Sequence, residues 1–311
     1  MFQLLWCLLL PCLIAARAAV AAPSTLPDGT PLCGTRSDPP ATYEHVVWIW
    51  FENHDYGSVV HAGDAPFINK TLIRGCGLAT NYHNITHPSL PNYIAATSGL
   101  RASALGRFRS DCNAVGRCRT RKPSIFAQAP SWGAYAESMV KPCQRQFKAP
   151  YAASHNPAVY YRGLDDCADN AVNLKRLGDD LEANALPAFT FIVPNSCHSM
   201  HECSVRAGDA WLAHLVAKLV ASDAYQSGET AIFITFDEGG HRGSNWCAKN
   251  THDRGCHVPA IVVSPYTPPG TQARDLFNHY SLLRTTEELL GIDTFLGRAA
   301  SASSMRAAFG L

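Results

Sequence analysis

The sequence predicts an α/β fold with a largely parallel central sheet and helices on both of its faces. Four apolar runs have the length and composition of buried strands, and they lie at 45–50, 189–193, 230–236 and 258–264. Stretches with helical spacing separate these runs. Strands that alternate with helices are typical of a parallel sheet that is covered on both sides.

The amino-terminal segment 1–22 has the pattern of a secretory signal, because an apolar core at 4–14 leads into an alanine-rich stretch. Pro11 and Arg17 interrupt this run, so a membrane-spanning helix is not expected there. No later segment is long and apolar enough to span a membrane. Residues 23–311 contain no repeat or linker, so we expect one domain, secreted and without stable membrane insertion.

Charge and cysteine content narrow the class of protein. The chain has 26 Lys and Arg residues and 25 Asp and Glu residues, and cleavage after residue 22 would remove only Arg17, which leaves 25 of each sign. This balance argues against a protein that binds nucleic acid by bulk charge. Ten of the twelve cysteines follow the signal segment, which predicts up to five disulfides. Three close pairs would each clip a loop: Cys112/Cys118, Cys197/Cys203 and Cys247/Cys256. The absence of a CxxC pair disfavours a structural zinc site.

The first predicted strand, 45–50, runs into Phe51, Glu52 and Asn53. Ligands of open α/β sheets bind at the carboxyl ends of the strands. A carboxylate and an amide oxygen are suitable ligands for a divalent cation. Glu52 and Asn53 are therefore candidate metal ligands, and the alternative is an ordinary polar loop.

The stretch Thr86–Tyr93 carries a hydroxyl, an imidazole and a carboxamide on a backbone that two prolines stiffen. A helix is predicted to begin near Asn92. Ser89 would then lie among the free N–H groups of a helix start, where an anion is also favoured. Ser89 is a candidate nucleophile towards a phosphoryl group, and the alternative is that Ser89 or Thr86 only caps the helix.

A basic stretch at 101–122 contains a single acid, Asp111, and the cysteine pair Cys112/Cys118. Such a loop could steer an anionic substrate towards a site. The alternative is a solvated surface without a function.

Helices are also predicted at 65–75, 124–140, 208–221 and 281–290. The helix at 124–140 is based on the spacing of its aromatic residues, and Gly291 is expected to end the last helix. His155 lies in a turn before Asn156 and Pro157, where a histidine has either a structural or a functional role.

Two further clusters of polar residues follow the later strands. His198, His201 and Glu202 lie between Cys197 and Cys203, a suitable place for an imidazole that contacts phosphate or metal. The strand 230–236 runs directly into Asp237, Glu238, Gly239 and Gly240. Adjacent acids beside glycines that permit close approach indicate metal ligation, with a polar turn as the alternative.

The sequence resembles the bacterial phosphoesterase family in nine motifs that occur in order between about residues 44 and 292. These are F-E-N at 51–53, H-P-S-L-P-N-Y at 87–93, P-S-I-F at 123–126, W-x-A-Y-A-E-S-M at 132–139, H-N-P at 155–157, M-H-E-C-S with G-D-A-W-L at 200–212, F-D-E-G at 236–239, H-V-P at 257–259 and H-Y-S-L-L-R-T-x-E at 279–287.

The resemblance implies an alkaline-phosphatase-like fold and a serine that attacks phosphorus while a metal holds it. It implies Ser89 as nucleophile and metal ligand, and Asn92 as a contact to a phosphoryl oxygen. His201 and His155 would bind or protonate phosphate oxygens. The implied metal ligands are Glu52, Asn53, Asp237 and Glu238. The sequence departs from the family where the loop commonly reads D-M-H-D, because here Ser199 replaces the first acid.

The leading hypothesis is a secreted, metal-dependent acid phosphatase that cleaves phosphate monoesters, including phosphoinositides, through a phosphoserine. A divalent ion (Mg, Ca, Zn or Mn) would activate the serine and offset phosphoryl charge. The expected substrate is a small-molecule or lipid phosphate ester, and no nucleic acid is expected. One alternative is a phospholipase C-type phosphodiesterase, and another is a secreted binding module without catalytic activity.

Overall fold

The computed structural model describes residues 24–108, 110–240, 247 and 252–311. The predicted signal segment 1–22 lies outside these residues. Within the described chain, no helix is long and apolar enough to cross a membrane.

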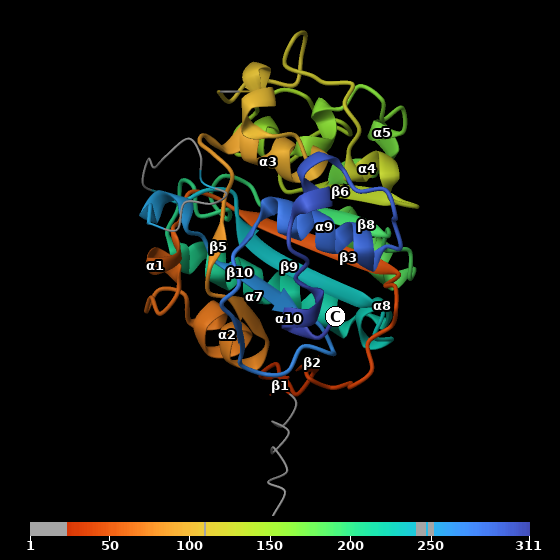
Figure 1. The fold of residues 1–311 in the computed structure, drawn as a ribbon. Helices are drawn as coiled ribbons and strands as arrows, with labels where there is room; N and C mark the ends of the chain where they lie inside the picture. Colours follow the sequence, from red (N-terminus) through yellow and green to blue (C-terminus); the bar gives the residue numbers. More distant parts are fainter. Residues whose placement is uncertain (1–23, 109, 241–246, 248–251) are drawn as a thin grey trace, which may run out of the picture.

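An eight-stranded sheet forms the centre of the molecule (Figure 1). Its strands lie in the order β11 (Thr271–Ala273), β4 (Gly77–Ala79), β10 (Ala260–Val263), β9 (Thr230–Phe236), β3 (His45–Phe51), β8 (Phe189–Val193), β6 (Trp132–Ala136) and β7 (Ala171–Asn173). The five strands from β9 to β7 are mutually parallel, and β10 is antiparallel to both of its neighbours. The prediction of a largely parallel α/β sheet is confirmed.

Two small sheets accompany the large one. β1 (Ser24–Thr25) pairs with β2 (Pro31–Cys33) in antiparallel fashion, and β5 (Tyr82–His83) pairs with β12 (Phe277–Asn278) in parallel.

The longest helices are α3 (Ser89–Ser98), α7 (Val205–Ala221) and α9 (His279–Leu289). The shorter helical segments are α1 (Tyr56–Val59), the π-helical turn η1 (Ile68–Leu72), α2 (Ile73–Gly75), α4 (Ile125–Gln128), α5 (Cys167–Asn170), α6 (Arg176–Glu182), α8 (Asp223–Gln226) and α10 (Arg306–Phe309). The 3-10 turns are η2 (Ala102–Ala104), η3 (Gly106–Phe108), η4 (Ala153–His155), η5 (Pro157–Tyr160), η6 (Arg254–Cys256) and η7 (Gly297–Ser301).

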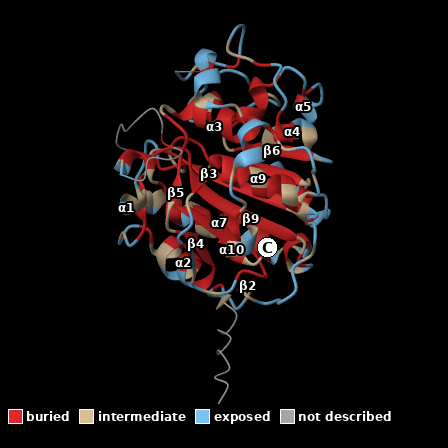
Figure 2. Cartoon of the chain, in the orientation of Figure 1, coloured by how far each residue is buried: buried red, intermediate tan, exposed pale blue. Residues whose placement is uncertain are grey.

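Helices cover both faces of the sheet because side chains alternate along each strand. On β3, the indole N–H of Trp48 donates to the Thr286 hydroxyl of α9 at 2.9 Å. Three residues later, Phe51 points the other way and packs edge-on against Trp211 of α7, with ring centroids 6.0 Å apart. Trp48 and Phe51 are completely buried, and Figure 2 shows the central strands as part of the buried core.

The predicted helix at 124–140 is wrong. The segment forms the short helix α4 and then the strand β6, which pairs with β8 so that Trp132 lies opposite Phe189. Pro130 lies between the two elements and follows the end of α4, where a helix cannot easily continue through a proline. Phe126 and Trp132 do not share a helix face but pack together across the turn, with ring centroids 5.3 Å apart.

The other predicted helices are present with shifted ends. α3 begins at Ser89 and not at Asn92, since Pro91 is tolerated in a first turn. α7 begins at Val205, because the hydroxyl of Ser204 accepts a hydrogen bond from the Ala207 N–H at 3.3 Å. Gly291 has a φ of 68° just after α9, as expected of a glycine at a helix end.

The ten cysteines form five disulfides. The three close pairs predicted from the sequence are confirmed. The remaining four cysteines connect distant segments, as Cys33–Cys76 and Cys143–Cys167.

Candidate active site

Glu52 and Asp237 lie side by side at the carboxyl edge of the sheet. In the parallel pairing of β3 with β9, Phe51 is opposite Phe236, so the next residue of each strand leaves the sheet at the same level. The Asp237 N–H donates to the Phe51 carbonyl at 3.0 Å, and the Asn53 N–H donates to Asp237 Oδ1 at 3.1 Å. Both carboxylates are completely buried.

Helix α3 presents two hydroxyl groups to Glu52. Ser89 Oγ donates to Glu52 Oε2 at 2.9 Å, and the Tyr93 hydroxyl donates to Glu52 Oε1. Ser89 and Tyr93 are four residues apart and therefore lie on the same face of the helix. Ser89 Oγ also lies within hydrogen-bond reach of Asp237, although burial and the charge of Glu238 keep the pKa of that carboxyl group well above its ordinary value.

Glu238 lies near enough to Glu52 and Asp237 to belong to the same group. Its Oε2 lies 2.7 Å from His87 Nδ1 and 3.5 Å from Asn92 Nδ2. Glu238 is 7% exposed, so the site contains a third largely buried carboxylate.

The three carboxyl groups disfavour one another's charge. Burial raises the pKa of Glu52 well above its ordinary value, and the neighbouring charges of Asp237 and Glu238 raise it further. Burial followed by the charge of Glu238 has the same effect on the pKa of Asp237. A bound cation would offset this unfavourable negative charge, because it favours the ionised form of each carboxyl group.

The carboxylate group fits a divalent cation. Asp237 Oδ2 is buried and has no hydrogen-bond partner among the described residues. It lies near the carboxylate of Glu52 and the hydroxyl oxygen of Ser89. Oxygen atoms are the ligands that hard divalent cations prefer. An orphaned buried oxygen normally carries a large desolvation cost, which a cation would remove.

Two histidines flank Glu52 on another side. His155 Nδ1 lies 3.4 Å from Glu52 Oε1, and suitable ligand atoms of Glu52, His155 and His201 all lie within 4.8 Å of one another. Burial and then the nearby His201 lower the pKa of His155 to about 3. The ring is therefore neutral at ordinary pH, and its Nδ1 lacks a hydrogen-bond partner among the described residues. His155 is suited to accept a hydrogen bond or bind a metal, and is poorly suited to supply a proton.

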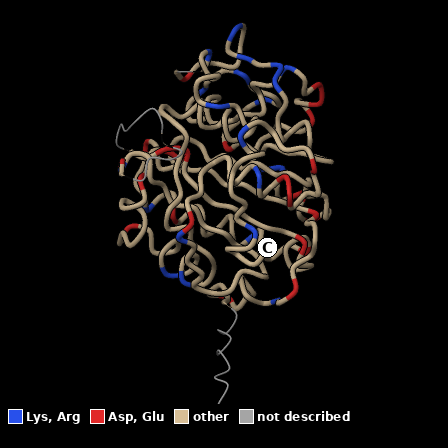
Figure 3. Tube along the Cα trace, viewed as in Figure 1, with Lys and Arg blue, Asp and Glu red and all other residues tan. Residues whose placement is uncertain are grey.

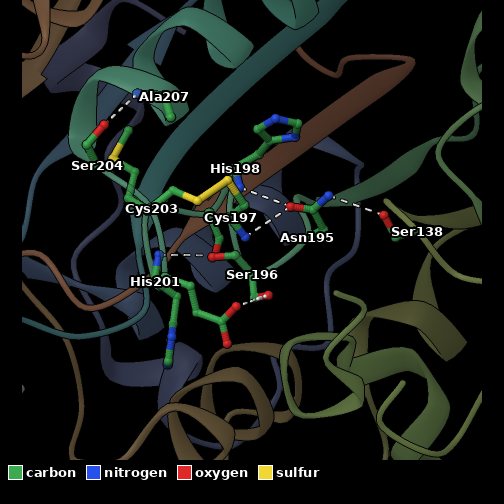
Figure 4. The surroundings of a disulfide bond; sticks show 12 residues. Ser138, Asn195, Ser196, Cys197, His198, His201, Cys203, Ser204 and Ala207 are labelled. Atoms are coloured by element: carbon green, nitrogen blue, oxygen red, sulfur yellow. Dashed lines mark hydrogen bonds between the residues drawn. A yellow bond between two sulfur atoms is a disulfide. The ribbon is translucent and has the colours of Figure 1, made fainter. Parts of the chain in front are cut away.

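The loop 195–203 holds His201 in place. The Cys197–Cys203 disulfide closes it, and Asn195 Oδ1 accepts the N–H groups of Cys197 and His198 at 3.0 Å (Figure 4). The rings of His198 and His201 project in opposite directions from the loop (Figure 4).

His198 does not contact the carboxylate group but packs against Glu137 and Trp211. Its Nδ1 lies 2.9 Å from both carboxylate oxygens of Glu137, and its ring stacks on Trp211. Ser199, which stands where the resembling family has an acid, is buried and accepts the His201 N–H at 3.4 Å. Neither residue adds a charged ligand to the Glu52 group.

The two asparagines proposed from the sequence have different surroundings. Asn92 is buried and its amide is occupied, because Oδ1 accepts the N–H groups of Ile85 and Thr86 at 2.9 and 3.0 Å. Its Nδ2 donates to backbone carbonyls of the same turn. Asn53 is half-buried, with a φ of 55°, and its side chain forms no hydrogen bond with the described residues.

Gly240 permits the close approach that the sequence indicated. A Cβ atom at this position would lie 2.5 Å from the Asn53 carbonyl oxygen, so a larger residue would separate the turns that follow β3 and β9. Gly239 has a similar constraint against the Gly255 carbonyl oxygen, at 2.6 Å.

The sequence assigned no site role to Tyr93, His87 or Asp111, although each lies beside the site. The helical spacing from Ser89 could have identified Tyr93, and its place next to Pro88 could have drawn attention to His87. Asp111 Oδ1 accepts the Leu90 N–H at 2.9 Å, a contact between distant segments that no local pattern predicts.

Comparison with solved structures supports the fold. A protein of the alkaline phosphatase superfamily from Vibrio parahaemolyticus matches with a TM-score of 0.57 and 15% identity, over 89% of this chain and 74% of that one. The lipoteichoic acid synthase LtaP from Listeria monocytogenes matches with a TM-score of 0.52 and 11% identity, over 85% and 77% of the two chains. The fold is therefore alkaline-phosphatase-like.

Relatives in sequence come from fungi and bacteria. An acid phosphatase of Aspergillus fumigatus is 26% identical over 80% of this chain and 55% of its own length. The phosphatidylinositol-3-phosphatase of Mycobacterium tuberculosis is 25% identical over 84% and 82% of the two chains. The alignments span 55% and 66% of the acid phosphatases of A. fumigatus and Aspergillus niger. The model of the Phosphoesterase family matches residues 50–293, most of the sequence and all of the site residues described above, and the chain belongs to this family.

Proposed function

We propose that this protein is a secreted phosphatase that cleaves phosphate monoesters through a phosphoserine at Ser89. The observation that carries the proposal is the hydrogen bond of Ser89 Oγ to Glu52 at 2.9 Å, at a helix start and beside Asp237. Acid phosphatases and a phosphatidylinositol-3-phosphatase among the relatives support the same chemistry.

Each residue has a proposed role in this reaction. Glu52 and Asp237 would hold a divalent cation together with Ser89 Oγ, and Glu238 and Asn53 would complete or orient this group. When bound, the cation would supply Lewis-acid stabilisation of the negative charge on the serine oxygen and the phosphoryl group. Oxygen ligands of this kind bind Mg, Ca, Mn and Zn.

The protein side chains position the reacting groups. Ser89 Oγ would attack phosphorus and release the alcohol, and water would then release phosphate from the serine. His201, which is exposed at the surface of its loop, would contact the phosphoryl oxygens or protonate the leaving alkoxide to give the alcohol. His155 would accept a hydrogen bond or bind a metal as a neutral ring. Asn92 would fix the turn that carries Ser89, because its amide is already bonded to that turn.

The test is the variant Ser89→Ala in p-nitrophenyl phosphate hydrolysis. We expect kcat to fall by about a thousandfold or more, since the nucleophile is lost. Ser98→Ala is a matched control in the same helix, whose hydroxyl donates to the Ile94 carbonyl. It should retain wild-type turnover. Wild-type turnover in Ser89→Ala would refute the assignment of the nucleophile, and absence of turnover and metal in the wild type would favour a binding module.

A substrate panel separates the two esterase classes. We expect release of phosphate from p-nitrophenyl phosphate and from phosphatidylinositol 3-phosphate in mixed micelles. A higher kcat/KM for phosphatidylcholine cleavage, with phosphocholine as product, would instead support the phosphodiesterase. The five disulfides support a proposal of secretion, because such bonds persist in oxidising compartments.

A further inference from the structure

Asp111 places a carboxylate beside the proposed nucleophile. Its Oδ1 accepts the N–H of Leu90 at 2.9 Å, and Leu90 directly follows Ser89 in the first turn of α3. Pro88 is the N-cap residue of this ten-residue helix and gives it no side-chain cap. Asp111 therefore comes from a distant loop to satisfy an N–H that a phosphoryl oxygen on Ser89 could otherwise use.

The loop that carries Asp111 is otherwise basic. Figure 3 shows lysine and arginine segments gathered over the loops above α3. Arg119 lies near enough to Arg121, Arg145 and Arg162 for their charges to lower its pKa, after a larger effect of burial. Asp111 nevertheless forms no ion pair with a described lysine or arginine. Its position is set by the Cys112–Cys118 disulfide and by the Tyr160 hydroxyl, which donates to the Cys112 carbonyl.

Two buried polar atoms elsewhere in the site are available to bind a ligand. His155 is 4% exposed and Asp237 is fully buried, and each has one polar atom without a partner among the described residues. Burial raises the pKa of Asp111, whereas the Leu90 N–H and the nearby His201 act in the opposite direction. Burial raises the pKa of Tyr93 and of Tyr160, and the charge of Asp111 adds a smaller part to each shift.

We propose that Asp111 competes with the phosphoryl group for the Leu90 N–H and thereby weakens the binding of inorganic phosphate. This inference rests on the proposed function of the same site. A carboxylate and a phosphate dianion cannot occupy one N–H together without strong repulsion. Asp111 must therefore move away or share a proton when phosphate binds, which favours release of the product.

The experiment measures the affinity of inorganic phosphate for the metal-supplemented protein by calorimetry at about pH 8, where phosphate is a dianion. Asp111→Asn and Asp111→Ala should each bind phosphate about tenfold more tightly than the wild type, because one negative charge is removed. The inhibition constant of phosphate in ester hydrolysis should fall by the same factor.

Asp209→Asn is a matched control. Asp209 also accepts backbone N–H groups, those of Phe67 and Ile68, at 2.9 and 2.8 Å, but it lies on α7 and outside the proposed site. It should leave phosphate affinity unchanged even if its melting temperature falls. Equal phosphate affinity in wild type and both Asp111 variants would show that Asp111 only caps the helix, and would overturn the inference.

The outcome remains distinct from a failure of the proposed function. If Ser89→Ala retains turnover, the nucleophile is misassigned, and the phosphate titration still tests Asp111. If the wild type and the Asp111 variants all fail to bind phosphate while turnover depends on Ser89, the inference is overturned and the proposed function stands.

Discussion

Glu52 is a carboxylate whose charge is strongly disfavoured by its surroundings. It is completely buried, it receives hydroxyl hydrogen bonds from Ser89 and Tyr93, and two other carboxylates lie nearby. Burying several like charges is costly unless a counter-charge is present. This cost is the physical reason to regard Glu52 as part of a functional site and not as part of the core.

The Tyr93 hydroxyl tests the role of Glu52. Tyr93→Phe should lower kcat about tenfold, because Glu52 loses a donor that fixes its orientation, and should destabilise the fold by about 1–3 kcal/mol. Tyr161→Phe is the control, since the Tyr161 hydroxyl lies 2.6 Å from Thr97 Oγ1 on the same helix. It should change the melting temperature alone. Equal kcat in both variants would contradict the proposed role of Tyr93.

The raised pKa of Glu287 implies that the free energy of unfolding depends on pH. Burial raises its pKa to about 7, although the Leu296 N–H and the charge of Arg284 act in the opposite direction. The folded state therefore holds a proton that the unfolded chain releases, and this group's contribution to stability falls as pH rises from about 4.5 to about 7. The full effect is on the order of 3 kcal/mol. The free energy of unfolding, measured in urea, should fall less between about pH 5 and about pH 8 in Glu287→Gln than in the wild type.

At the scale of elements, the central strands were predictable because each is a short, continuous apolar run. β3, β8 and β9 are buried on both faces and so lack polar interruptions. β6 was missed because Trp132 and Tyr135, three residues apart, have helical spacing, although both lie on a buried strand. Glu52, Ser89 and Asp237 could be selected from the sequence because each adjoins a strand end or helix start.

The contacts of these residues with distant segments could not be predicted from local patterns. The hydrogen bond from Leu90 to Asp111 depends on a loop whose path is fixed by a disulfide. Likewise, His198 follows Cys197 in the same loop as His201, but only the fold places its ring against Glu137. Such choices are decided by packing between elements, which sequence spacing does not record.

Glu137 braces the loop that carries His201. It accepts the Asn195 N–H at 3.0 Å and the Trp211 indole N–H at 3.2 Å, in addition to its contact with His198. Glu137→Ala should lower kcat/KM about tenfold by loosening this loop. Glu137→Gln should recover part of the loss, because it keeps an acceptor.

Glu182→Ala is the comparison for Glu137, since Glu182 lies at the surface end of α6. It should have wild-type kcat/KM and an unchanged far-ultraviolet spectrum. Full activity in Glu137→Ala would show that the brace has no influence on His201.

At the scale of the whole molecule, the proposed cation site would couple cation binding to stability. The site joins β3, β9 and α3, so a cation that binds only the folded chain stabilises all three elements together. Chelation should lower the melting temperature, and divalent cation at about 100 times its Kd should add about 2.7 kcal/mol. Asp237→Asn should reduce this response in a thermal-shift titration. A melting temperature that changes neither with chelator nor with added cation would contradict the proposed metal site.

The most direct test of the central claim is to trap the covalent phosphate. The protein is mixed with p-nitrophenyl phosphate, quenched in acid within the first turnover, digested and analysed by mass spectrometry. We expect one phosphorylated peptide, with the phosphate on Ser89, and none in Ser89→Ala. Phosphate on another side chain, or turnover with no phosphorylated residue at any time, would contradict the assignment of Ser89 as the nucleophile.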